Sequence, residues 1–337
     1  GGVGLAGDMA RGAGVDFNLG GMIGRAVGQE RAAVALSNQG FMPGAGGANG
    51  RVQDPRKILD TARSVADTYA RSTDEILQAT SAFVGLTGDL AGARAIMGDL
   101  ALLSNATGSN LTDMASAAAS VSTALEQGFA GTAQQRMEAT SDVMRAIAGQ
   151  GKVGAVEIKD LAAQMAQLAA ASGEFAGKRE DLLAFVGVMA QESRKAGGSA
   201  SATQAATSIL SFATNLSKPS KAQQKMLAQY GLDPFADKGK TAVKSPEEFI
   251  KEAIYKTRGN LQALGGIFST SGSMRAVRGF ANIYNQAGGG AAGQAAVEAE
   301  IATLKRASLD RAEAERANAE VMRTAVAKAQ RFQNNLE

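Results

Sequence analysis

Cysteine, histidine and tryptophan are all absent from this sequence of 337 residues. The lack of cysteine excludes disulfides and thiol nucleophiles, and the lack of histidine removes the commonest metal ligand and the usual acid–base group at neutral pH. A catalytic site would have to be built from carboxylates, lysine, serine or tyrosine. We therefore expect a protein that is not an enzyme and that binds no cofactor or metal ion.

Aromatic residues make up only 5% of the chain and there are five prolines, whereas 45% of the residues are hydrophobic. This composition is sufficient for a core, but the core must be built largely from small and aliphatic side chains on closely packed helices. No uncharged apolar run reaches the length of about 18 residues that a membrane-spanning helix needs. The chain begins at Gly1 rather than at a methionine, which indicates a piece of a longer protein or a processed chain.

Apolar residues recur at helical spacing in short segments, each of which ends at glycine, proline or a polar turn. One segment runs from Ile58 to Tyr69, and another runs from about Gln134 to Ile147 and is followed by Gly149 and Gly151. The regular stops predict an all-α fold, in which a compact array of short antiparallel helical hairpins precedes one long C-terminal helix.

Two segments begin with the pattern of a capping box, in which a serine and a glutamate three residues later satisfy each other's backbone N–H groups. Ser72 and Glu75 form one pattern. Ser245 and Glu248 form the other, with Pro246 at the first helical position. We expect a helix to start sharply at each serine.

The composition divides the chain into three parts. Residues 1–50 form a glycine-rich arm that is flexible or apolar, residues 51–290 form a compact helical domain, and residues 291–337 form a long charged helix. Within the first part, Gly20 and Gly24 belong to a repeat at every fourth residue, a spacing that lets helices approach closely.

The last part of the chain predicts a single long helix. From Ala291 to Leu336 there is no proline, and the only glycine is Gly293. A helix of about 45 residues would reach roughly 65–70 Å. Its apolar positions indicate an imperfect coiled coil, with a lone solvated helix as the alternative. The candidate self-association residues are Val297, Ile301, Leu304, Met322 and Phe332.

A local excess of positive charge lies between residues 215 and 258, although the whole chain carries a net charge of only +3. This segment has nine basic and five acidic residues, and its central lysines are Lys238, Lys240 and Lys244. These three lysines form a candidate contact for a partner or for nucleic acid. A solvated helix face is the simpler interpretation, because no aromatic side chains alternate with the lysines to stack on bases.

Several motifs occur in the order typical of one protein family. They are the segments Ser72–Ile76, Gly85–Asp89, Ala101–Gly108, Gly151–Leu161, Gly198–Leu216, Tyr230–Phe235, Gly239–Lys240 and Ser245–Glu248. Over about residues 55–285, the chain resembles the tail tape-measure proteins of long-tailed bacteriophages. The most specific part is the segment from Gly231 to Glu248, because alanine-rich helices alone are common.

The resemblance implies a structural component of the virion, located in the lumen or at the tip of the phage tail and assembled in the host cytoplasm. Such a protein sets the length of the tail, takes part in tail assembly and leaves ahead of the DNA during genome ejection. The implied partners are tail tube and tail tip proteins, with DNA and the host membrane as further contacts during ejection. The symmetry of the tube implies a homo-oligomer, either a trimer or a hexamer.

A molecular ruler needs an extended helix, whose length grows by about 1.5 Å per residue. Residues 55–285 are interrupted too often to form one, so we expect them to fold back compactly as a terminal or tip-associated module. The ruler portion would begin near Ala291.

Other features of the sequence leave three alternative functions open. A cell-wall hydrolase would need carboxylates in a cleft, for which Glu174, Asp181 and Glu192 are available, although ordinary surface carboxylates account for them. Residues 1–50 would form the membrane-active part of an ejection channel. An unrelated helical scaffold or adaptor would contact DNA through the lysines between residues 218 and 258, with an affinity that falls steeply with salt.

Overall fold

The computed structural model describes residues 19–39, 54–126, 129–173, 175–196, 198–239, 242–308 and 310–334. These residues form α-helices and contain no strand, which confirms the all-α prediction. The chain divides into two compact units: unit 1 comprises residues 1–119 and 311–337, and unit 2 comprises residues 120–310. The three-part division by composition and the antiparallel hairpins stay predictions.

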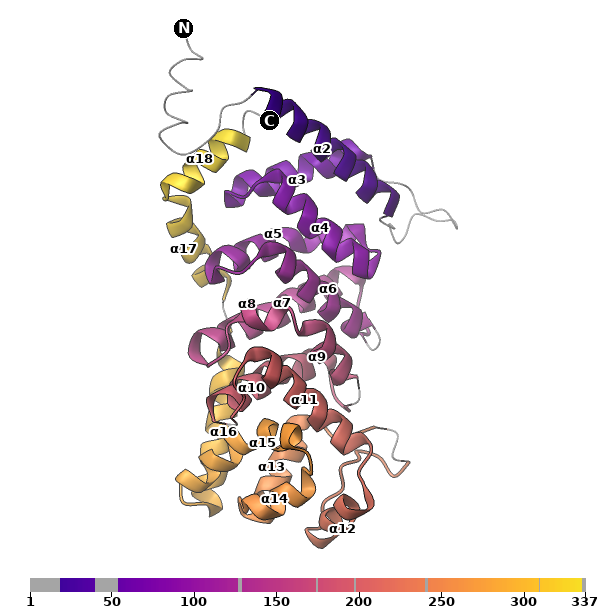
Figure 1. Cartoon of the computed structure of the whole chain (residues 1–337), viewed down its shortest axis with the longest axis vertical. Coiled ribbons are helices and arrows are strands. Elements are labelled where there is room, and N and C mark those ends of the chain that lie inside the picture. The colour runs from indigo at the N-terminus through magenta and orange to yellow at the C-terminus, as the bar shows by residue number, and fades with distance from the viewer. Residues whose placement is uncertain are drawn as a thin grey trace. The chain divides into compact units, whose positions relative to one another are not determined.

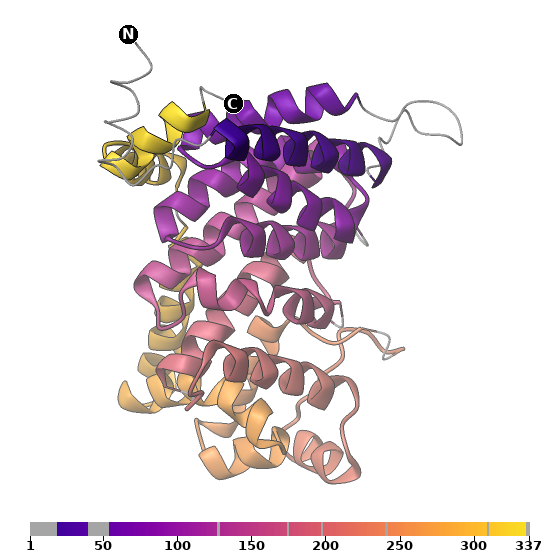
Figure 2. The same cartoon turned by 45° about the horizontal axis from the view of Figure 1, so that its top comes forward.

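Unit 1 combines the N-terminal helices with the two last helices of the chain (Figure 1). Figure 2 shows its N-terminal helices (indigo to purple) packed on one another. The helices are α2 (Leu19–Gln39), α3 (Pro55–Tyr69), α4 (Thr73–Thr87), α5 (Leu90–Thr107), the first half of α6 (Leu111–Glu126), α17 (Arg311–Met322) and α18 (Ala325–Asn334).

Side-chain caps determine where the helices of unit 1 begin. Ser72 Oγ accepts the backbone N–H of Glu75 at 3.1 Å, as the sequence predicts. The Glu75 carboxylate, however, pairs with the guanidinium of Arg71 at 2.7 Å. An ion pair with a neighbouring arginine is therefore the role of Glu75. In the same unit, Asp89 accepts the N–H of Gly92 at 2.7 Å and starts α5.

Helix α2 lies within the segment that was predicted to be an arm, and it packs against α3 and α4. The glycine repeat does not produce this packing, because Gly24 and Gly28 are exposed and a Cβ on either would meet nothing within 4 Å. Ala33 and Leu36, at 1% and 2% exposed, supply the buried face of α2. Residues 1–18 and 40–50 lie outside the described residues.

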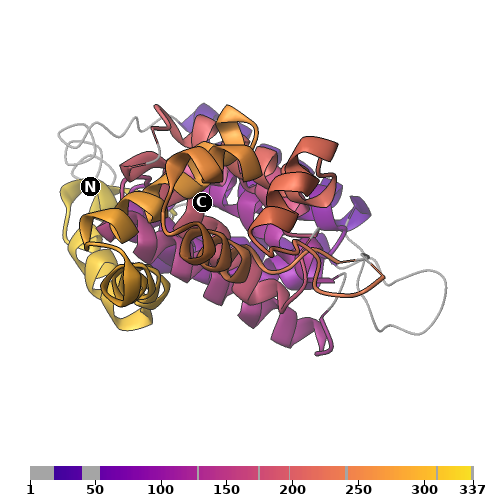
Figure 3. The ribbon, with the colours of Figure 1, turned by 90° about the horizontal axis from the view of Figure 1, so that it is seen from below.

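In its described residues, unit 2 contains ten complete helices and the second half of α6. The helices are α7 (Ala133–Val153), α8 (Ile158–Ala162), α9 (Met165–Ser172), α10 (Arg179–Lys195), α11 (Ala202–Ser217), α12 (Lys221–Gln229), α13 (Pro246–Thr257), α14 (Leu261–Ile267), α15 (Ser271–Gln286) and α16 (Gly290–Arg306). Its centre is formed by α10, α11 and α15, which pack on one another. Figure 3 shows α15 and α16 (orange) side by side.

Phenylalanine side chains fill the core of unit 2. Phe212 of α11 stacks on Phe268 with ring centroids 5.6 Å apart and approaches Phe175 at 6.1 Å. Phe249 meets Phe268 edge to face at 6.0 Å. These four rings are all buried, so four of the twelve phenylalanines of the chain meet in one cluster.

The prediction of one long C-terminal helix is wrong, because this segment forms three short helices, α16, α17 and α18. The first break follows Arg306, where the Ser308 N–H turns back to the Arg306 carbonyl at 2.8 Å. The second lies at residues 323–324, where Thr324 Oγ1 accepts the N–H of Ala327 at 3.1 Å and so caps α18. Local hydrogen bonds thus interrupt a segment that contains neither proline nor a breaking glycine.

Candidate functional site

The described residues 231–239 and 242–245 of unit 2 form the two sides of a hairpin that projects between α12 and α13 (Figures 1 and 2). Gly231 has φ +61°, a left-handed conformation that suits glycine and ends α12. Phe235 and Val243 pair in antiparallel fashion across the hairpin. The Lys244 N–H donates to the Pro234 carbonyl at 2.8 Å. The backbone therefore fixes the base of the projection.

The hairpin is anchored in the core of unit 2 at its base. Leu232 and Val243 are 6% and 3% exposed. The Ala176 N–H donates to the Val243 carbonyl at 2.6 Å. After the hairpin, Ser245 Oγ accepts the Glu248 N–H at 3.3 Å and starts α13, as predicted.

The structure places the three predicted contact lysines differently. Lys238 is exposed towards the tip of the hairpin. Lys240 lies outside the described residues. Lys244 Nζ lies 2.7 Å from Glu252 Oε2 of α13, in an ion pair that is mostly shielded from solvent. Their role as a partner contact stays a prediction.

Glutamates of α13 neutralise much of the local positive charge. Glu252 binds Lys256 at 2.7 Å in addition to Lys244, and Glu247 binds Lys251 at 3.2 Å and Lys305 at 3.0 Å. Burial acts to raise the pKa of both glutamates, but the hydrogen bonds and charges of the lysines outweigh it and hold both pKa values below the ordinary one. Counting lysines along the sequence therefore overstates the basic surface.

The predicted self-association residues divide between the two units. Val297, Ile301 and Leu304 are 0%, 3% and 3% exposed on α16, where they belong to the core of unit 2. Met322 is half-buried at the end of α17. The side chain of Phe332 lies outside the described residues. Self-association through these residues stays a prediction.

A buried carboxylate on α10 is the most unusual ionisable group in unit 2. Glu192 is 0% exposed. Neither of its oxygens accepts a hydrogen bond from the described residues, and Lys195 Nζ lies 3.7 Å from Oε1. The same Lys195 ammonium donates to Glu300 Oε1 of α16 at 2.6 Å. On the other side, α15 passes close to Glu192 at Gly279.

This environment favours the protonated form of Glu192. Burial first, and the neighbouring Glu300 second, raise the pKa of Glu192 to about 7, while Lys195 acts in the opposite direction. The pKa of Glu300 is lowered, because the hydrogen bond and charge of Lys195 outweigh its partial burial. Below about pH 7, Glu192 therefore keeps its proton while Glu300 is ionised, at the contact between α10 and α16.

Asp181 and Glu192, two of the carboxylates considered for wall cleavage, do not form a catalytic pair. Asp181 is exposed in the first turn of α10, and Glu192 lies eleven residues later on the same helix, about 16 Å away along its axis. The two carboxyl groups of a glycosidase lie about 5–10 Å apart. Glu174 is outside the described residues. Glu192 is also closed off from a polymeric substrate.

Sequence reasoning missed the pairing of Glu192 with Glu300, since the two residues are far apart in the chain. The sequence nevertheless contains a signal that Glu192 is buried. Leu182, Phe185 and Met189 form the buried stripe of α10 at helical spacing, and Glu192 occupies its next position. A carboxylate on a buried stripe indicates a shifted pKa.

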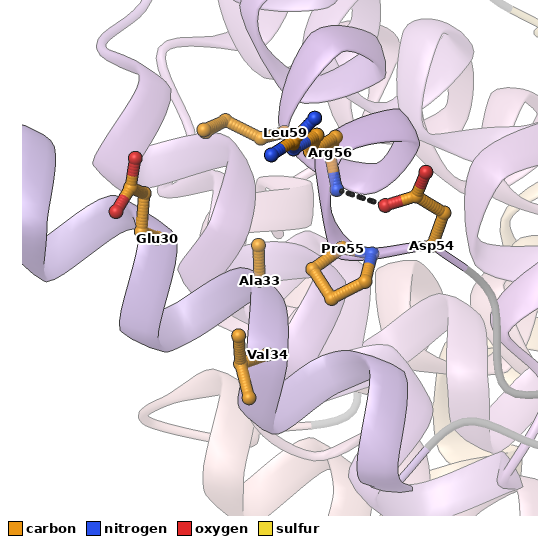
Figure 4. Close-up of a pocket in the computed structure, with 7 residues that line it drawn as sticks. All are labelled: Glu30, Ala33, Val34, Asp54, Pro55, Arg56 and Leu59. Atoms are coloured by element: carbon orange, nitrogen blue, oxygen red, sulfur yellow. Dashed lines mark hydrogen bonds between the residues drawn. The ribbon is translucent and has the colours of Figure 1, made fainter.

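A pocket of about 310 Å³ lies in unit 1 between α2 and the start of α3 (Figure 4). Its lining is formed by Glu30, Ala33, Val34, Asp54, Pro55, Arg56 and Leu59. The Asp54 carboxylate accepts the backbone N–H of Arg56 at 3.0 Å, so it serves as the cap of α3. The lining thus combines four apolar residues with the charged residues Glu30, Asp54 and Arg56. It does not place a nucleophile beside a base.

The described residues contain no cluster of three carboxylates that could hold a metal ion. Within the same ranges, no helix combines the length and apolarity needed to cross a membrane. A family model described as a phage-related minor tail protein matches residues 59–269, which is more than half of the chain. No curated protein matches the chain, and no solved structure matches it.

Proposed function

Because the chain belongs to the family of phage-related minor tail proteins and is thus a structural component of a phage tail, we propose that it acts there as the compact region of a tape-measure protein. In this role it contributes to tail assembly, to tail-length determination and to genome ejection. The single observation that carries the proposal is the family match over residues 59–269, which falls within the tape-measure resemblance over residues 55–285.

The helices of this region support a role as a module rather than as an extended ruler. Its longest described helix, α7, has 21 residues, and a helix of that length spans only about 30 Å. A ruler must extend by about 1.5 Å for every added residue. We therefore assign length determination to the segment that begins near Ala291, in a state in which α16, α17 and α18 are straightened into one helix.

The proposed partners are tail tube and tail tip proteins, and the proposed assembly is a homo-oligomer, a trimer or a hexamer. The hairpin with Lys238, Lys240 and Lys244 is the proposed partner contact, because it projects from an anchored base. DNA and the host membrane are proposed contacts during ejection only. The ion pairs of Glu247 and Glu252 with lysines argue against a DNA-binding adaptor as the main function.

Tail length in phage particles tests the proposal. One in-frame deletion removes α17, the residues Arg311–Met322, and the other removes α13 and α14, the residues Pro246–Ile267. We expect the first deletion to shorten the tail by about 1.5 Å per residue, or roughly 18 Å, and the second to block assembly or infection without a proportional change in length. Electron microscopy of intact tails provides the measurement.

Two results would contradict the proposal in different ways. If the deletion of α17 leaves tail length unchanged and infection fails, the chain is an assembly or tip module and the ruler lies elsewhere. If both deletions leave normal tails and infectious particles, the tape-measure role itself is wrong.

A further inference from the structure

The two last helices of the chain, α17 and α18, form an arm that packs on unit 1 (Figures 1 and 2). Helix α17 packs against α5, and α18 packs against α3. The arm follows α16 of unit 2 through the link at residues 307–310. One covalent link thus connects the arm to a helix of the other unit.

The arm docks at a polar centre on unit 1. The Arg71 guanidinium donates to Asn105 Oδ1 at 2.7 Å and to Ser104 Oγ at 2.8 Å, in addition to its ion pair with Glu75. Asn105 Nδ2 donates to Asn318 Oδ1 of α17 at 2.6 Å. These bonds give the docked arm a defined register.

Contacts at the far end of the arm are also polar. Asn334 Nδ2 of α18 donates to the Arg71 carbonyl at 2.8 Å. Arg331 lies 3.2 Å from Asp67, and these side chains are 49% and 40% exposed. Among the arm side chains that the structure describes, only two alanines, Ala314 and Ala327, are buried.

The contrast with α16 shows that the arm is the weakly held part of the C-terminal segment. Val297, Ile301 and Leu304 bury large apolar side chains in unit 2. Burial of such a side chain stabilises the packed state far more than a solvent-exposed ion pair does. The arm is therefore positioned specifically but held weakly.

One helix break precedes α17 and a second separates α17 from α18. Neither contains a residue that forbids a helix. Residues 307–310 read Ala-Ser-Leu-Asp, and residues 323–324 read Arg-Thr. Neither break contains proline or glycine, the strongest helix breakers. Nothing in the sequence of these two breaks therefore forbids a continuous helix through them.

We propose that the arm exchanges between copies of this chain, so that α17 and α18 of one copy dock on the polar centre of unit 1 in a second copy. The proposal rests on the proposed self-association and names its surface. The recognised partner is a second copy because Asn318, Asn334 and Arg331 match groups that every copy presents in unit 1. Exchange of identical elements is a common route to homo-oligomers.

Cysteine cross-linking provides a direct test, because the chain has no cysteine of its own. One tagged full-length chain carries Asp67→Cys, and a second chain with a different tag carries Arg331→Cys. The two positions are partly exposed, so we expect both variants to fold, which circular dichroism verifies. After the purified chains are mixed and oxidised, we expect a cross-linked heterodimer whose yield rises with protein concentration.

The matched control uses Lys195→Cys and Glu300→Cys, whose side chains are also in contact, at 2.6 Å, but between α10 and the firmly packed α16. Here we expect cross-linking only when both cysteines are in one chain. The arm pair should give about a tenfold excess of heterodimer or more over this control, which corresponds to ~1.4 kcal/mol.

Three results would overturn the exchange. They are a double variant Asp67→Cys/Arg331→Cys that closes only within single chains at all concentrations, a heterodimer yield equal to that of the control, and the absence of any cross-link. The test uses purified chains and no tail, so its failure leaves the tail-length experiment unaffected.

Discussion

Units 1 and 2 use the same limited set of amino acids to build two different cores. In the described part of unit 1, Phe83 is the only buried phenylalanine, and alanine and leucine side chains fill the space between closely packed helices. In unit 2, a cluster that includes Phe212 and Phe268 fills the centre. A chain with few aromatic residues can thus form one core by close helix approach and another by concentrating its large side chains.

The units also differ in how they treat a polar group inside the fold. In unit 1, Arg71 is paired with Glu75 and makes hydrogen bonds to Ser104 and Asn105. In unit 2, Glu192 is buried without a hydrogen-bond donor. When every polar group has a hydrogen-bond partner, the network holds the side chains in one arrangement. A buried carboxylate without a partner is more stable when protonated, so the stability of the packing around it depends on pH.

The largest expected effect concerns the aromatic core. Phe212→Ala should lower the free energy of unfolding by about 3–5 kcal/mol, because it leaves a cavity and removes two ring contacts. Phe83→Ala in unit 1 should cost about 0.5–1.5 kcal/mol less, since the described residues give Phe83 no ring contact. Urea unfolding of both variants gives the comparison. An equal or larger loss for Phe83→Ala would show that the phenylalanine cluster does not distinguish the two cores.

The next effect compares the same substitution in the two units. At Gly279 of α15, a Cβ would lie 2.7 Å from the Glu192 carbonyl oxygen, so α15 and α10 would have to separate. Gly279→Ala should therefore destabilise unit 2 by about 1–3 kcal/mol. At Gly28 of α2, a Cβ meets nothing within 4 Å, and Gly28→Ala should stabilise the helix by about 0.5–1 kcal/mol.

Thermal or urea unfolding of these two variants measures both effects. Opposite signs would confirm that only the glycine of unit 2 serves close packing. If both substitutions stabilise the protein, α10 and α15 have room to adjust and the contact at Gly279 is not tight.

Protonation of Glu192 gives the third prediction. Its pKa is raised from 4.5 to about 7 by burial, so the folded state keeps a proton that the unfolded state has already lost. The resulting stabilisation is complete below pH 4.5 and is lost as the pH rises to about 7. We expect a loss on the order of 1–3 kcal/mol across this range. The lowered pKa of Glu300 acts below its ordinary value, outside this window.

The variant Glu192→Gln separates this effect from the rest of the protein. The amide has a similar shape and does not titrate, so the dependence on pH between 4.5 and 7 should be reduced in this variant. Urea unfolding at several pH values measures the slope. A slope that persists unchanged in Glu192→Gln would assign it to other groups.

Local sequence patterns predicted much of the fold because helix starts and stops are determined by near neighbours. Ser72 and Ser245 cap helices where the sequence places them. The local sequence pattern gave the wrong helix end where tertiary contacts determine how far the helix continues. The predicted stop at Gly149 and Gly151 lies inside α7, which continues to Val153, since the buried Gln150 side chain donates to the Ala184 carbonyl of α10 and holds this turn in the core.

The same distinction applies to the candidate site. The hairpin around Lys238 follows from its glycine, proline and capping residues, which are local signals. The ion pair between Lys244 and Glu252, by contrast, depends on how the hairpin returns to α13. The contact of Lys195 with Glu300 joins helices that are distant in sequence. Burial and pairing, and hence pKa values, could not be obtained from the sequence alone.

The smallest expected effect concerns the arm on unit 1. Arg331→Ala removes an exposed ion pair with Asp67 and should change the free energy of unfolding by less than about 1 kcal/mol. Arg71→Ala in the polar centre should cost more, about 1.5–3 kcal/mol, because it leaves the partly buried Glu75 and Asn105 without their partner. Urea unfolding of the two variants measures this difference. If Arg331→Ala destabilises the protein as much as Arg71→Ala, the arm is a firm part of the core of unit 1 and does not detach easily.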